Sequence, residues 1–486
     1  MNTPIRRLSL LMAVLFTTLL VSATLIQFVQ AKSLGSMAAN KRTLLDTYSR
    51  ERGSIIVGGQ AVAKSIPVGD QYKFLRQYPQ GELYSQVTGF YSYVVGAPYG
   101  LEHAADDLLT GDSDSLFVRR VTDLITGRKT AGATLELTID PKAQKAADDA
   151  LGKSKGAVVA LDPKTGAILA MVSHPQYDPN PLSSHDLGKA SKAWQQLASD
   201  PDKAYVNRAL SSLYPPGSTF KVVTAAAALE NGLVTDENSK VPGPAELDLP
   251  LTSTNLPNET GQPCGPNNET TLIHALEISC NTAFGSLGLD LGGEKLRAQA
   301  AKFGFGDSLQ VPLRAATSSV PADMNEPQSA QAGIGQYDVK TTPLQMAMVA
   351  AGIANKGRVM TPYIIDSVRS ANLDVISSTP DPTELSQAVS EKTASIVTKM
   401  MVSVVDNGSG ARARIDGVQV AGKTGTAQHE EGKPPHAWFI SFAPADDPKV
   451  AVAVVVEDGG VTGSEVGGGR VAAPIAKKVM EAVLGR

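Results

Sequence analysis

The apolar segment Leu8–Ile26 constrains what this chain can become more than any other feature of its sequence. The segment contains no charged residue, follows Arg6 and Arg7, and is long enough to span the apolar core of a bilayer, about 30 Å thick. A cleaved secretory signal is the alternative, because Val29-Gln30-Ala31 fits a cleavage site, but the apolar part of a signal usually ends after roughly 7 to 15 residues. We therefore predict an uncleaved single-pass anchor, with the two arginines inside the cell and the body of the protein outside.

The exported part of the 486-residue chain is large enough for two or three packed domains. A formal net charge of -4 and an aromatic content of 5% argue against a nucleic-acid partner, which needs a basic surface and stacking side chains. Cys264 and Cys280 lie where thiols oxidise, so we expect a disulfide, with two unconnected buried thiols as the alternative. The spacing of cysteines and histidines fits no zinc motif, and no metal or other cofactor is indicated.

The chain divides into three regions by composition and pattern. Residues 1–31 form a short cytoplasmic tail and the transmembrane anchor. Residues 32–135 mix short strand-like runs with charged helical stretches, which predicts a small non-catalytic α+β domain. Residues 136–486 form a larger region. We predict an α+β protein whose larger domain has a central antiparallel sheet flanked by helices.

The larger region carries the clearest secondary-structure signals. Two apolar runs on either side of a turn predict a hairpin, and three later runs predict an antiparallel meander. Helix formers between Pro216-Gly217 and Asn231-Gly232 predict a helix. The predicted strands are Gly156–Leu161, Ala167–Val172, Val418–Gly422, His436–Ala443 and Lys449–Glu457. The predicted helices are Pro141–Leu151, Ser218–Glu230, Leu272–Ile278, Ala283–Leu291 and Ala472–Leu484.

The sequence Ser218-Thr219-Phe220-Lys221 places a serine and a lysine one turn apart on the same face of a predicted helix. A serine hydroxyl is a weak nucleophile until a neighbouring base activates it, and a lysine can be that base when its surroundings favour the neutral amine. The helix N-terminus supplies unpaired N–H groups where an oxyanion would form. By itself the pattern is weak, since an N-cap serine followed by a solvated lysine looks the same.

Two further short motifs follow in the chain. Ser279-Cys280-Asn281 offers a hydroxyl and an amide at a break between two predicted short helices; Ser253-Thr254-Asn255 has the same pattern but lies in a Pro-rich excursion. Lys423-Thr424-Gly425-Thr426 ends a predicted strand, and its glycine allows a ligand to approach the backbone. Helix capping by Asn281 and an edge strand with polar residues are the structural alternatives.

The order of the three motifs is far more specific than any one of them. A Ser-x-x-Lys on a helix, a Ser-x-Asn on a loop and a Lys-Thr-Gly on a strand are, in this order, the signature of β-lactamases and penicillin-binding proteins.

The sequence resembles the class B penicillin-binding proteins, which are transpeptidases with one N-terminal anchor helix, and in particular their actinobacterial A-type members. The resemblance covers nearly the whole chain. It rests on longer strings around the three motifs and in the region before residue 140. These strings are Tyr214–Lys221, Ser279–Phe284, Gly333–Gln336, Lys423–Ala427, Arg52–Ile55, Tyr99–Glu102 and Leu137–Asp140.

The resemblance implies a role for each motif residue in a peptidoglycan DD-transpeptidase that releases terminal D-alanine. Ser218 would be the nucleophile, Lys221 its base, Ser279 a proton relay and Lys423 the residue that holds Ser279. The substrate-binding residues would be Asn281, Thr424, Gly425 and Thr426, with backbone N–H groups of Ser218 and Thr426 as the oxyanion hole. Stem peptides and β-lactams would be ligands, and membrane proteins of cell-wall synthesis or division would be partners.

Two other functions share parts of this pattern. A β-lactamase carries the same trio, but such enzymes are usually shorter and lack an upstream domain of about 100 residues. A non-enzymatic β-lactam sensor or division scaffold would need a substantial cytoplasmic region, and only about seven residues precede the anchor here. We expect no glycosyltransferase domain before residue 135 and no repeat modules after the last strand. The sequence does not identify the acceptor amine.

Overall fold

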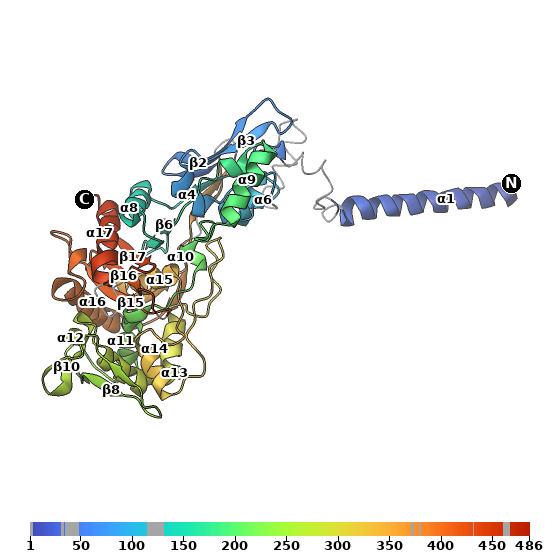
Figure 1. Cartoon of the computed structure of the whole chain (residues 1–486). Helices are drawn as coiled ribbons and strands as arrows, with labels where there is room; N and C mark the ends of the chain where they lie inside the picture. The colour runs from blue at the N-terminus through green and yellow to red at the C-terminus, as the bar shows by residue number, and fades with distance from the viewer. Residues whose placement is uncertain are drawn as a thin grey trace.

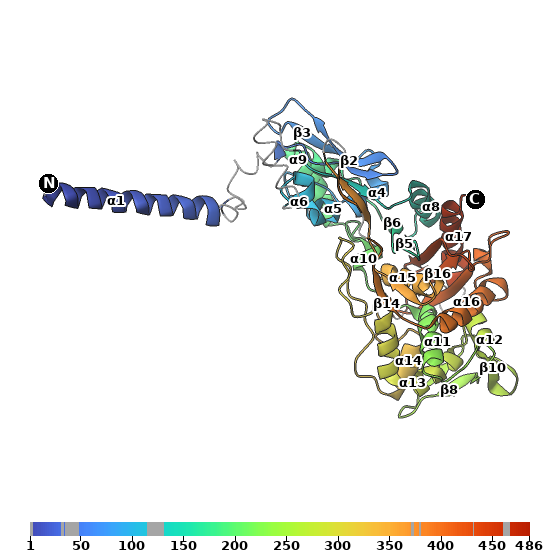
Figure 2. The ribbon, with the colours of Figure 1, turned by 180° about the vertical axis from the view of Figure 1, so that it is seen from behind.

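The computed structural model describes residues 3–30, 34, 48–113, 131–370, 374–378, 381–430, 432–459 and 467–486. Helix α1 (Thr3–Thr24) continues through the π-helical turn η1 (Leu25–Val29) and lies apart from the rest of the protein (Figures 1 and 2). Within the described residues it is the one helix long and apolar enough to cross a membrane, and its side chains are exposed. The predicted single-pass anchor therefore has a matching helix.

A five-stranded antiparallel sheet forms the centre of the larger domain, in the order β15-β16-β17-β5-β6. Its strands are β5 (Gly156–Leu161), β6 (Ile168–His174), β15 (Ala421–Ala427), β16 (His436–Ala443) and β17 (Val450–Val456). The predicted hairpin and the predicted three-stranded meander are both present and meet where β17 pairs with β5. Among the described strands β15 pairs with β16 alone, which makes it an edge strand.

Helices cover both faces of this sheet, which explains why its strands are continuous apolar runs. Along β17, Val452 and Val454 pack in one hydrophobic cluster with α8 (Pro141–Leu151) and α17 (Ala473–Val483). Ala453 points to the opposite face and joins the main core with α15 (Pro343–Ala354). Alternation along the strand thus sends successive side chains to different helical layers.

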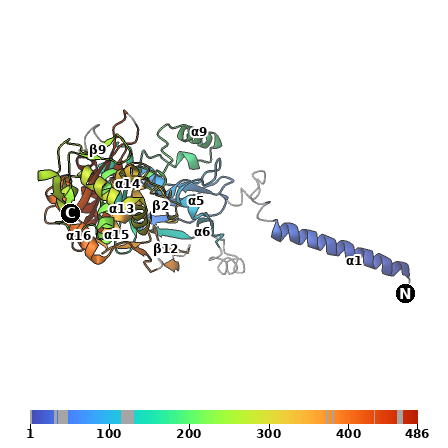
Figure 3. The same ribbon diagram turned by 90° about the horizontal axis from the view of Figure 1, so that it is seen from below.

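Other helices and short strands surround the sheet (Figures 1 to 3). Figure 3 shows α13 beside α14, and these two helices are in contact. The remaining helices are α9 (Leu187–Ala198), α10 (Arg208–Ser211), α11 (Lys221–Glu230), α12 (Leu272–Glu277), α13 (Asn281–Lys302), α14 (Glu326–Gly333) and α16 (Glu391–Asp406). The short strands are β7 (Lys240–Pro242), β8 (Glu246–Asp248), β9 (Asn255–Pro257), β10 (Glu269–Thr271), β11 (Arg358–Met360) and β14 (Glu384–Gln387).

The N-terminal domain contains a six-stranded sheet in the order β13-β12-β4-β1-β2-β3. Its strands are β1 (Ile55–Val57), β2 (Gln60–Pro67), β3 (Phe74–Gln77), β4 (Thr134–Leu137), β12 (Ile365–Arg369) and β13 (Val375–Ser378). Among its described residues, the helices are α4 (Gly81–Thr88), α5 (Gly100–Ala104) and α6 (Asp106–Thr110). The sequence did not indicate that β12 and β13, from the region after residue 135, extend this sheet: Val368 pairs with Leu135, and Arg369 forms a 2.7 Å ion pair with Glu136.

A buried charge cluster holds the N-terminal domain together. The Glu102 carboxylate, fully buried, accepts from Arg52 Nε at 2.5 Å and from Arg76 Nε at 2.7 Å. Tyr78 donates to the same carboxylate at 3.0 Å, and Asp106 forms an ion pair with Arg52 at 2.6 Å. Burial opposes ionisation of Glu102, but the two arginines outweigh it and lower its pKa. The strings Arg52–Ile55 and Tyr99–Glu102, which carry part of the family resemblance, therefore meet in this cluster.

Most predicted elements occur, with shifted ends. The helix Pro141–Leu151 is found with those bounds because Asp140 caps it and Pro141 suits its first turn. The strand predicted at Val418–Gly422 is instead Ala421–Ala427, so the Lys-Thr-Gly motif lies within the strand and not at its end. Full-length pairing with β16 extends the strand through these polar residues.

Candidate active site

Ser218 lies in the first turn of the helix that was predicted to carry it. This turn is a 3₁₀ helix, η4 (Gly217–Phe220), which leads directly into α11. Gly217 adopts φ 53°, which favours glycine, and its N–H donates to the Gly335 carbonyl at 3.0 Å. Thr219 closes the turn by donating to the Pro216 carbonyl at 2.7 Å. The turn places the Ser218 hydroxyl at a helix N-terminus, where N–H groups lack intrahelical acceptors.

Two buried lysines converge on Ser279. Lys221 Nζ donates to the Ser279 carbonyl at 2.6 Å, to Ser279 Oγ at 3.2 Å and to Asn281 Oδ1 at 2.7 Å. Lys423 Nζ donates to Ser279 Oγ at 2.9 Å from the opposite element, strand β15. Both lysine side chains are fully buried. We call Lys221, Ser279, Asn281 and Lys423 the two-lysine cluster; it joins the three motifs by direct hydrogen bonds.

The backbone of Ser279 is held in an uncommon conformation. Ser279 has φ 60°, a left-handed value that few residues other than glycine adopt. It lies between α12 and α13, where the sequence predicted a helix break. Such conformations persist where surrounding contacts determine them, and they concentrate at functional sites. Here the two lysines hold both the carbonyl and the hydroxyl of Ser279.

Glycine allows strand β15 to pass very close to the Ser218 turn. A Cβ on Gly425 would lie 2.8 Å from Thr219 Cγ2 and 3.1 Å from the Pro216 carbonyl oxygen. A Cβ on Gly217 would lie 2.5 Å from the Thr426 carbonyl oxygen. The distances of 2.5 and 2.8 Å are shorter than the contacts that real Cβ atoms make. The two motifs can therefore share one site only because both elements carry glycine there.

An open cleft of about 480 Å³ lies in front of this arrangement. Of the predicted site residues, Ser218, Asn281 and Thr426 line the cleft, whereas the side chains of Lys221 and Lys423 are fully buried. The lining also includes residues that sequence reasoning had not assigned to the site: Leu256, Pro257, Asn258, Glu259, Gln331, Ile334, Gln336, Gln428 and Pro435. Of these residues, Ile334 and Gln336 belong to the string Gly333–Gln336, which carries part of the family resemblance.

The two threonines of the Lys-Thr-Gly-Thr motif differ in their surroundings. Thr424 is fully buried, and its hydroxyl is 2.7 Å from Ser409 Oγ. Thr426 lines the cleft, and among the described residues its Oγ1 has no hydrogen-bond partner although the atom is buried. Of the two hydroxyls, that of Thr426 is therefore the more available to a ligand.

A second polar network supports the turn before Ser218. Glu457, just after β17, accepts from the Tyr214 hydroxyl at 2.7 Å and from Arg208 Nε at 2.9 Å. Burial disfavours the charged carboxylate, yet the hydrogen bond from Tyr214 and the charge of Arg208 lower the pKa of Glu457. Burial also raises the pKa of Tyr214, so its hydroxyl stays protonated and donates. Trp438 Nε1 donates to the Pro215 carbonyl at 3.1 Å, which fixes the residue that follows Tyr214.

Cys264 and Cys280 form a disulfide, as the sequence predicted, with their Cα atoms 6.1 Å apart. The bond ties the Pro-rich excursion to the residue between Ser279 and Asn281. The alternative motif Ser253-Thr254-Asn255 lies in that excursion, where Ser253 is exposed and Asn255 begins β9. The structure thus brings Ser279, and not Ser253, to the two lysines.

The fold and the cleft together define a class of protein. A serine at a helix N-terminus, a lysine one turn later and a Lys-Thr-Gly strand at the sheet edge characterise serine acyl-transfer proteins of the penicillin-binding and β-lactamase type.

Comparison with known proteins identifies the family. The penicillin-binding protein transpeptidase domain matches residues 156–481, and the dimerisation domain of penicillin-binding protein A matches residues 52–135. The chain is 45% identical to the peptidoglycan D,D-transpeptidase PbpA of Mycolicibacterium smegmatis over 100% of this chain and 99% of that protein. It is 43% identical to PbpA of Mycobacterium tuberculosis H37Rv over the same shares of the two chains. The protein belongs to the penicillin-binding protein transpeptidase family.

Solved structures agree with this assignment. The ceftriaxone acyl-enzyme complex of penicillin-binding protein A from M. tuberculosis superposes with a TM-score of 0.86 at 44% identity, covering 90% of this chain and 100% of that one. The penicillin G acyl-enzyme complex of the same protein gives a TM-score of 0.84 at 43% identity, with the same coverage. The predicted fold class and the predicted resemblance to A-type class B proteins are confirmed.

Proposed function

We propose that this protein is a peptidoglycan D,D-transpeptidase that acts through an acyl-enzyme on Ser218. The observation that carries the residue assignment is the position of the Ser279 hydroxyl, within hydrogen-bond distance of both Lys221 and Lys423. Family membership supplies the reaction class, and the two-lysine cluster supplies the groups that can move protons. Both are needed, because hydroxyls and amines alone do not specify a substrate.

Acylation begins with Ser218. Its Oγ attacks the carbonyl of the penultimate D-alanine of a stem peptide while Lys221, in its neutral form, takes the proton. The bond from Oγ to carbon forms, and the bond from that carbon to the nitrogen of the terminal D-alanine breaks. The Ser279 hydroxyl passes a proton to the departing amine and is resupplied by a neighbouring lysine. Lys423 positions Ser279 throughout.

Backbone N–H groups stabilise the tetrahedral intermediate. We assign this role to the N–H groups of Ser218 and Thr426, because the Ser218 turn and strand β15 approach each other at Gly217. Each such donor contributes roughly 3 to 4 kcal/mol at the transition state. The N-terminal turn of η4 adds the positive end of a helix dipole near the developing charge.

The stem peptide binds along the free edge of β15. An extended chain can add to an exposed sheet edge through main-chain hydrogen bonds, and β15 pairs with β16 on its other side. Gly425 lets the peptide approach, and Asn281, which lines the cleft, binds a stem-peptide amide. The terminal carboxylate accepts from Thr426, whose hydroxyl lacks a protein partner among the described residues. Thr424, whose hydroxyl contacts Ser409, supports this carboxylate site from behind.

The second half of the reaction needs a nucleophile other than water. An amine from a neighbouring stem peptide attacks the ester carbon, forms the cross-link and releases Ser218. A β-lactam imitates the terminal D-alanyl-D-alanine and acylates Ser218. The resulting acyl-enzyme hydrolyses too slowly for turnover. Penicillin-binding protein A from M. tuberculosis, at 43% to 44% identity, has been solved as acyl-enzymes with ceftriaxone and with penicillin G, which supports this behaviour here.

The membrane helix sets where the reaction takes place. With Arg6 and Arg7 on the cytoplasmic side, the domains that follow α1 lie outside the cell, where stem peptides are cross-linked. Membrane proteins of cell-wall synthesis or division are the partners we expect at α1 and at the N-terminal domain.

The direct test is an assay of cross-linking by the full chain in detergent. A donor peptide ending in D-alanyl-D-alanine and an acceptor amine should yield free D-alanine and a cross-linked product. Ser218→Ala should abolish both products, whereas Ser211→Ala, at an exposed serine of α10, should leave them unchanged. Rapid hydrolysis of penicillin without cross-linking would favour a β-lactamase. Stable labelling without cross-linking would favour a sensor, and both outcomes would refute the proposal.

A further inference from the structure

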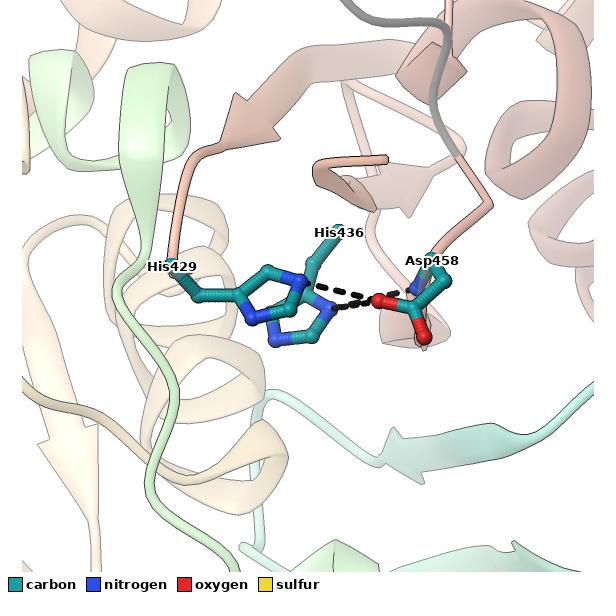
Figure 4. Close-up of side chains that lie close together, drawn as sticks. All are labelled: His429, His436 and Asp458. Carbon is teal, nitrogen blue, oxygen red and sulfur yellow. Dashed lines mark hydrogen bonds and ion pairs between the residues drawn. The ribbon is translucent and has the colours of Figure 1, made fainter. Parts of the chain in front are cut away.

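Three strand ends of the central sheet bring two histidines and an aspartate together beside the cleft. His429 lies two residues after β15, His436 begins β16, and Asp458 lies two residues after β17. The antiparallel register pairs His436 with Ala427 and pairs its neighbour Ala437 with Val456, so all three strand ends meet at one end of the sheet. Figure 4 shows the three side chains directed toward one another.

The contacts converge on one carboxylate oxygen. Asp458 Oδ1 is 2.9 Å from His429 Nε2 and 3.9 Å from His436 Nδ1. One potential ligand atom from each residue lies within 4.8 Å of the others. Ligand atoms around a tetrahedral zinc ion lie about 3.4 Å apart, given metal–ligand distances of about 2.1 Å. Small side-chain movements would therefore bring these atoms to coordinating distance.

We propose that His429, His436 and Asp458 form a binding site for a zinc-type divalent cation. Imidazole nitrogen and carboxylate oxygen are ligands that Zn²⁺ prefers, and three protein ligands leave a fourth position for water. Within the described residues this is the one group of three His, Cys, Asp or Glu side chains with metal-binding spacing. The site does not depend on the proposed reaction, because none of its residues belongs to the two-lysine cluster.

The surroundings favour a cation over two charged imidazoles. The rings of His429 and His436 are stacked, 3.9 Å apart and 3° from parallel, so protonating both would place two like charges in contact. Among the described residues, the ion pairs of Asp458 within 4 Å are both with these histidines.

One movement is required for binding. A metal ion lies near the plane of each imidazole that holds it, whereas the two rings are now parallel. The His436 ring is packed against the edge of Tyr214, with 5.3 Å between ring centroids, and starts a buried strand. His429 lies on the loop between β15 and β16, and among the described residues its Nε2 contacts the Pro434 carbonyl and Asp458. We therefore assign the movement to His429.

The position of the site predicts its effect. His429 and His436 lie at the two ends of the loop that connects β15 and β16, and the adjacent residues Gln428 and Pro435 line the substrate cleft. An ion bound to both histidines and to Asp458 would join the ends of this loop to β17. We infer that metal binding fixes one wall of the cleft and that its loss leaves the two-lysine cluster intact.

Binding can be tested without any measurement of catalysis. The metal-free full chain in detergent is titrated with Co²⁺, and the visible absorption bands of the bound ion are recorded, followed by displacement with Zn²⁺. We expect one ion per chain and tetrahedral-type bands. His429→Ala, His436→Ala and Asp458→Asn should each weaken binding by at least about tenfold. His274→Ala is the matched control, because His274 is an exposed histidine paired with a single carboxylate, that of Glu277, at 2.7 Å.

Two results would overturn the proposal. Wild-type protein that binds Co²⁺ no more tightly than the Asp458→Asn variant does would refute the site. Equal weakening by His274→Ala would show that binding is nonspecific. Unchanged thermal unfolding of the metal-free variants would show that they are folded; should His436→Ala unfold, His429→Ala, at a partly buried loop residue, decides the question. A tight site whose loading leaves the rate of acylation by penicillin unchanged would overturn the effect on the cleft wall.

Discussion

The two domains bury positive charge in opposite ways. In the N-terminal domain, Arg52 and Arg76 share the carboxylate of Glu102. Arg52 also pairs with Asp106, so two carboxylates balance the two cations. In the catalytic domain, Lys221 and Lys423 donate to the hydroxyl, amide and carbonyl oxygens of Ser279 and Asn281. Both arrangements are buried and well hydrogen-bonded, but only the first neutralises its charge with a carboxylate in direct contact.

This difference separates a structural network from a reactive one. Burial of an ion is costly, and pairing with an opposite charge compensates that cost while fixing the protonation state. A lysine held by neutral oxygens can give up its proton without leaving a carboxylate uncompensated. Changes in the arginine cluster should therefore alter stability, and changes in the two-lysine cluster should alter the reaction rate.

The largest effect is expected for Lys221→Ala. Removing the general base should slow acylation of Ser218 by penicillin by about 10² to 10⁴-fold, while reversible binding persists. The free energy of unfolding should change little or rise, because a buried amine is removed. Stopped-flow acylation kinetics and denaturant unfolding measure the two quantities. An unchanged acylation rate would exclude Lys221 as the base.

The converse effect is expected for Glu102→Gln. Removing the carboxylate leaves Arg52 and Arg76 buried without its charge, which should lower the free energy of unfolding by about 3 to 5 kcal/mol. Acylation per folded molecule should not change. Asp112→Asn is the matched control, since Asp112 forms an exposed ion pair with Arg50 at 3.1 Å and should contribute less than about 1 kcal/mol. An equal loss of unfolding free energy in the two variants would show that the buried cluster contributes no more than an exposed ion pair.

The disulfide links stability to the catalytic cluster. Cys264→Ser together with Cys280→Ser should lower the free energy of unfolding by about 3 kcal/mol, as expected for a closed loop of this size. Because Cys280 lies between Ser279 and Asn281, acylation should also slow. Thiol alkylation of unfolded, unreduced protein checks the bond itself. Finding both thiols alkylated would contradict the disulfide bond. An unchanged acylation rate in the double variant would contradict the link to the catalytic cluster.

The smallest effect is a pH dependence that arises in the arginine cluster. The pKa of Glu102 is lowered in the folded state, so its contribution to stability is fully present above the unfolded pKa of about 4.3 and is lost as pH falls through the lower folded value. Wild type should therefore lose more stability than Glu102→Gln on acidification below about pH 4. Parallel loss in both proteins, measured by denaturant unfolding across this range, would exclude Glu102 as the source.

Local sequence signals predicted much of the catalytic domain. The hairpin β5–β6 and the meander β15–β17 follow from apolar runs separated by turns, and Asp140 with Pro141 marks the start of α8. The two-lysine cluster was expected only through the combination of three motifs, each of which is weak alone. The spacing of the motifs along the chain does not show that they are in contact. The fold brings them together, through the close approach of the two elements at Gly217 and Gly425.

Long-range pairings explain what the sequence did not indicate. Strand β12 joins the N-terminal sheet through Val368 and Leu135, and no local pattern identifies a partner so far along the chain. The residues of the proposed metal site gave no signal in the sequence for the same reason: His436 begins β16, Asp458 follows β17, and their separation along the chain fits no common metal motif. Gln428 likewise lines the cleft because the loop between β15 and β16 lies beside the cleft. Each of these contacts depends on strand register.

The central claim is that the two-lysine cluster serves a nucleophile at Ser218. The most direct measurement is mass spectrometry of the full chain after incubation with a penicillin, with the adduct located by peptide mapping. We expect one adduct, on the peptide that contains Ser218, and no adduct in Ser218→Ala. An adduct on Ser279 or another residue, or covalent labelling that persists in Ser218→Ala, would contradict it.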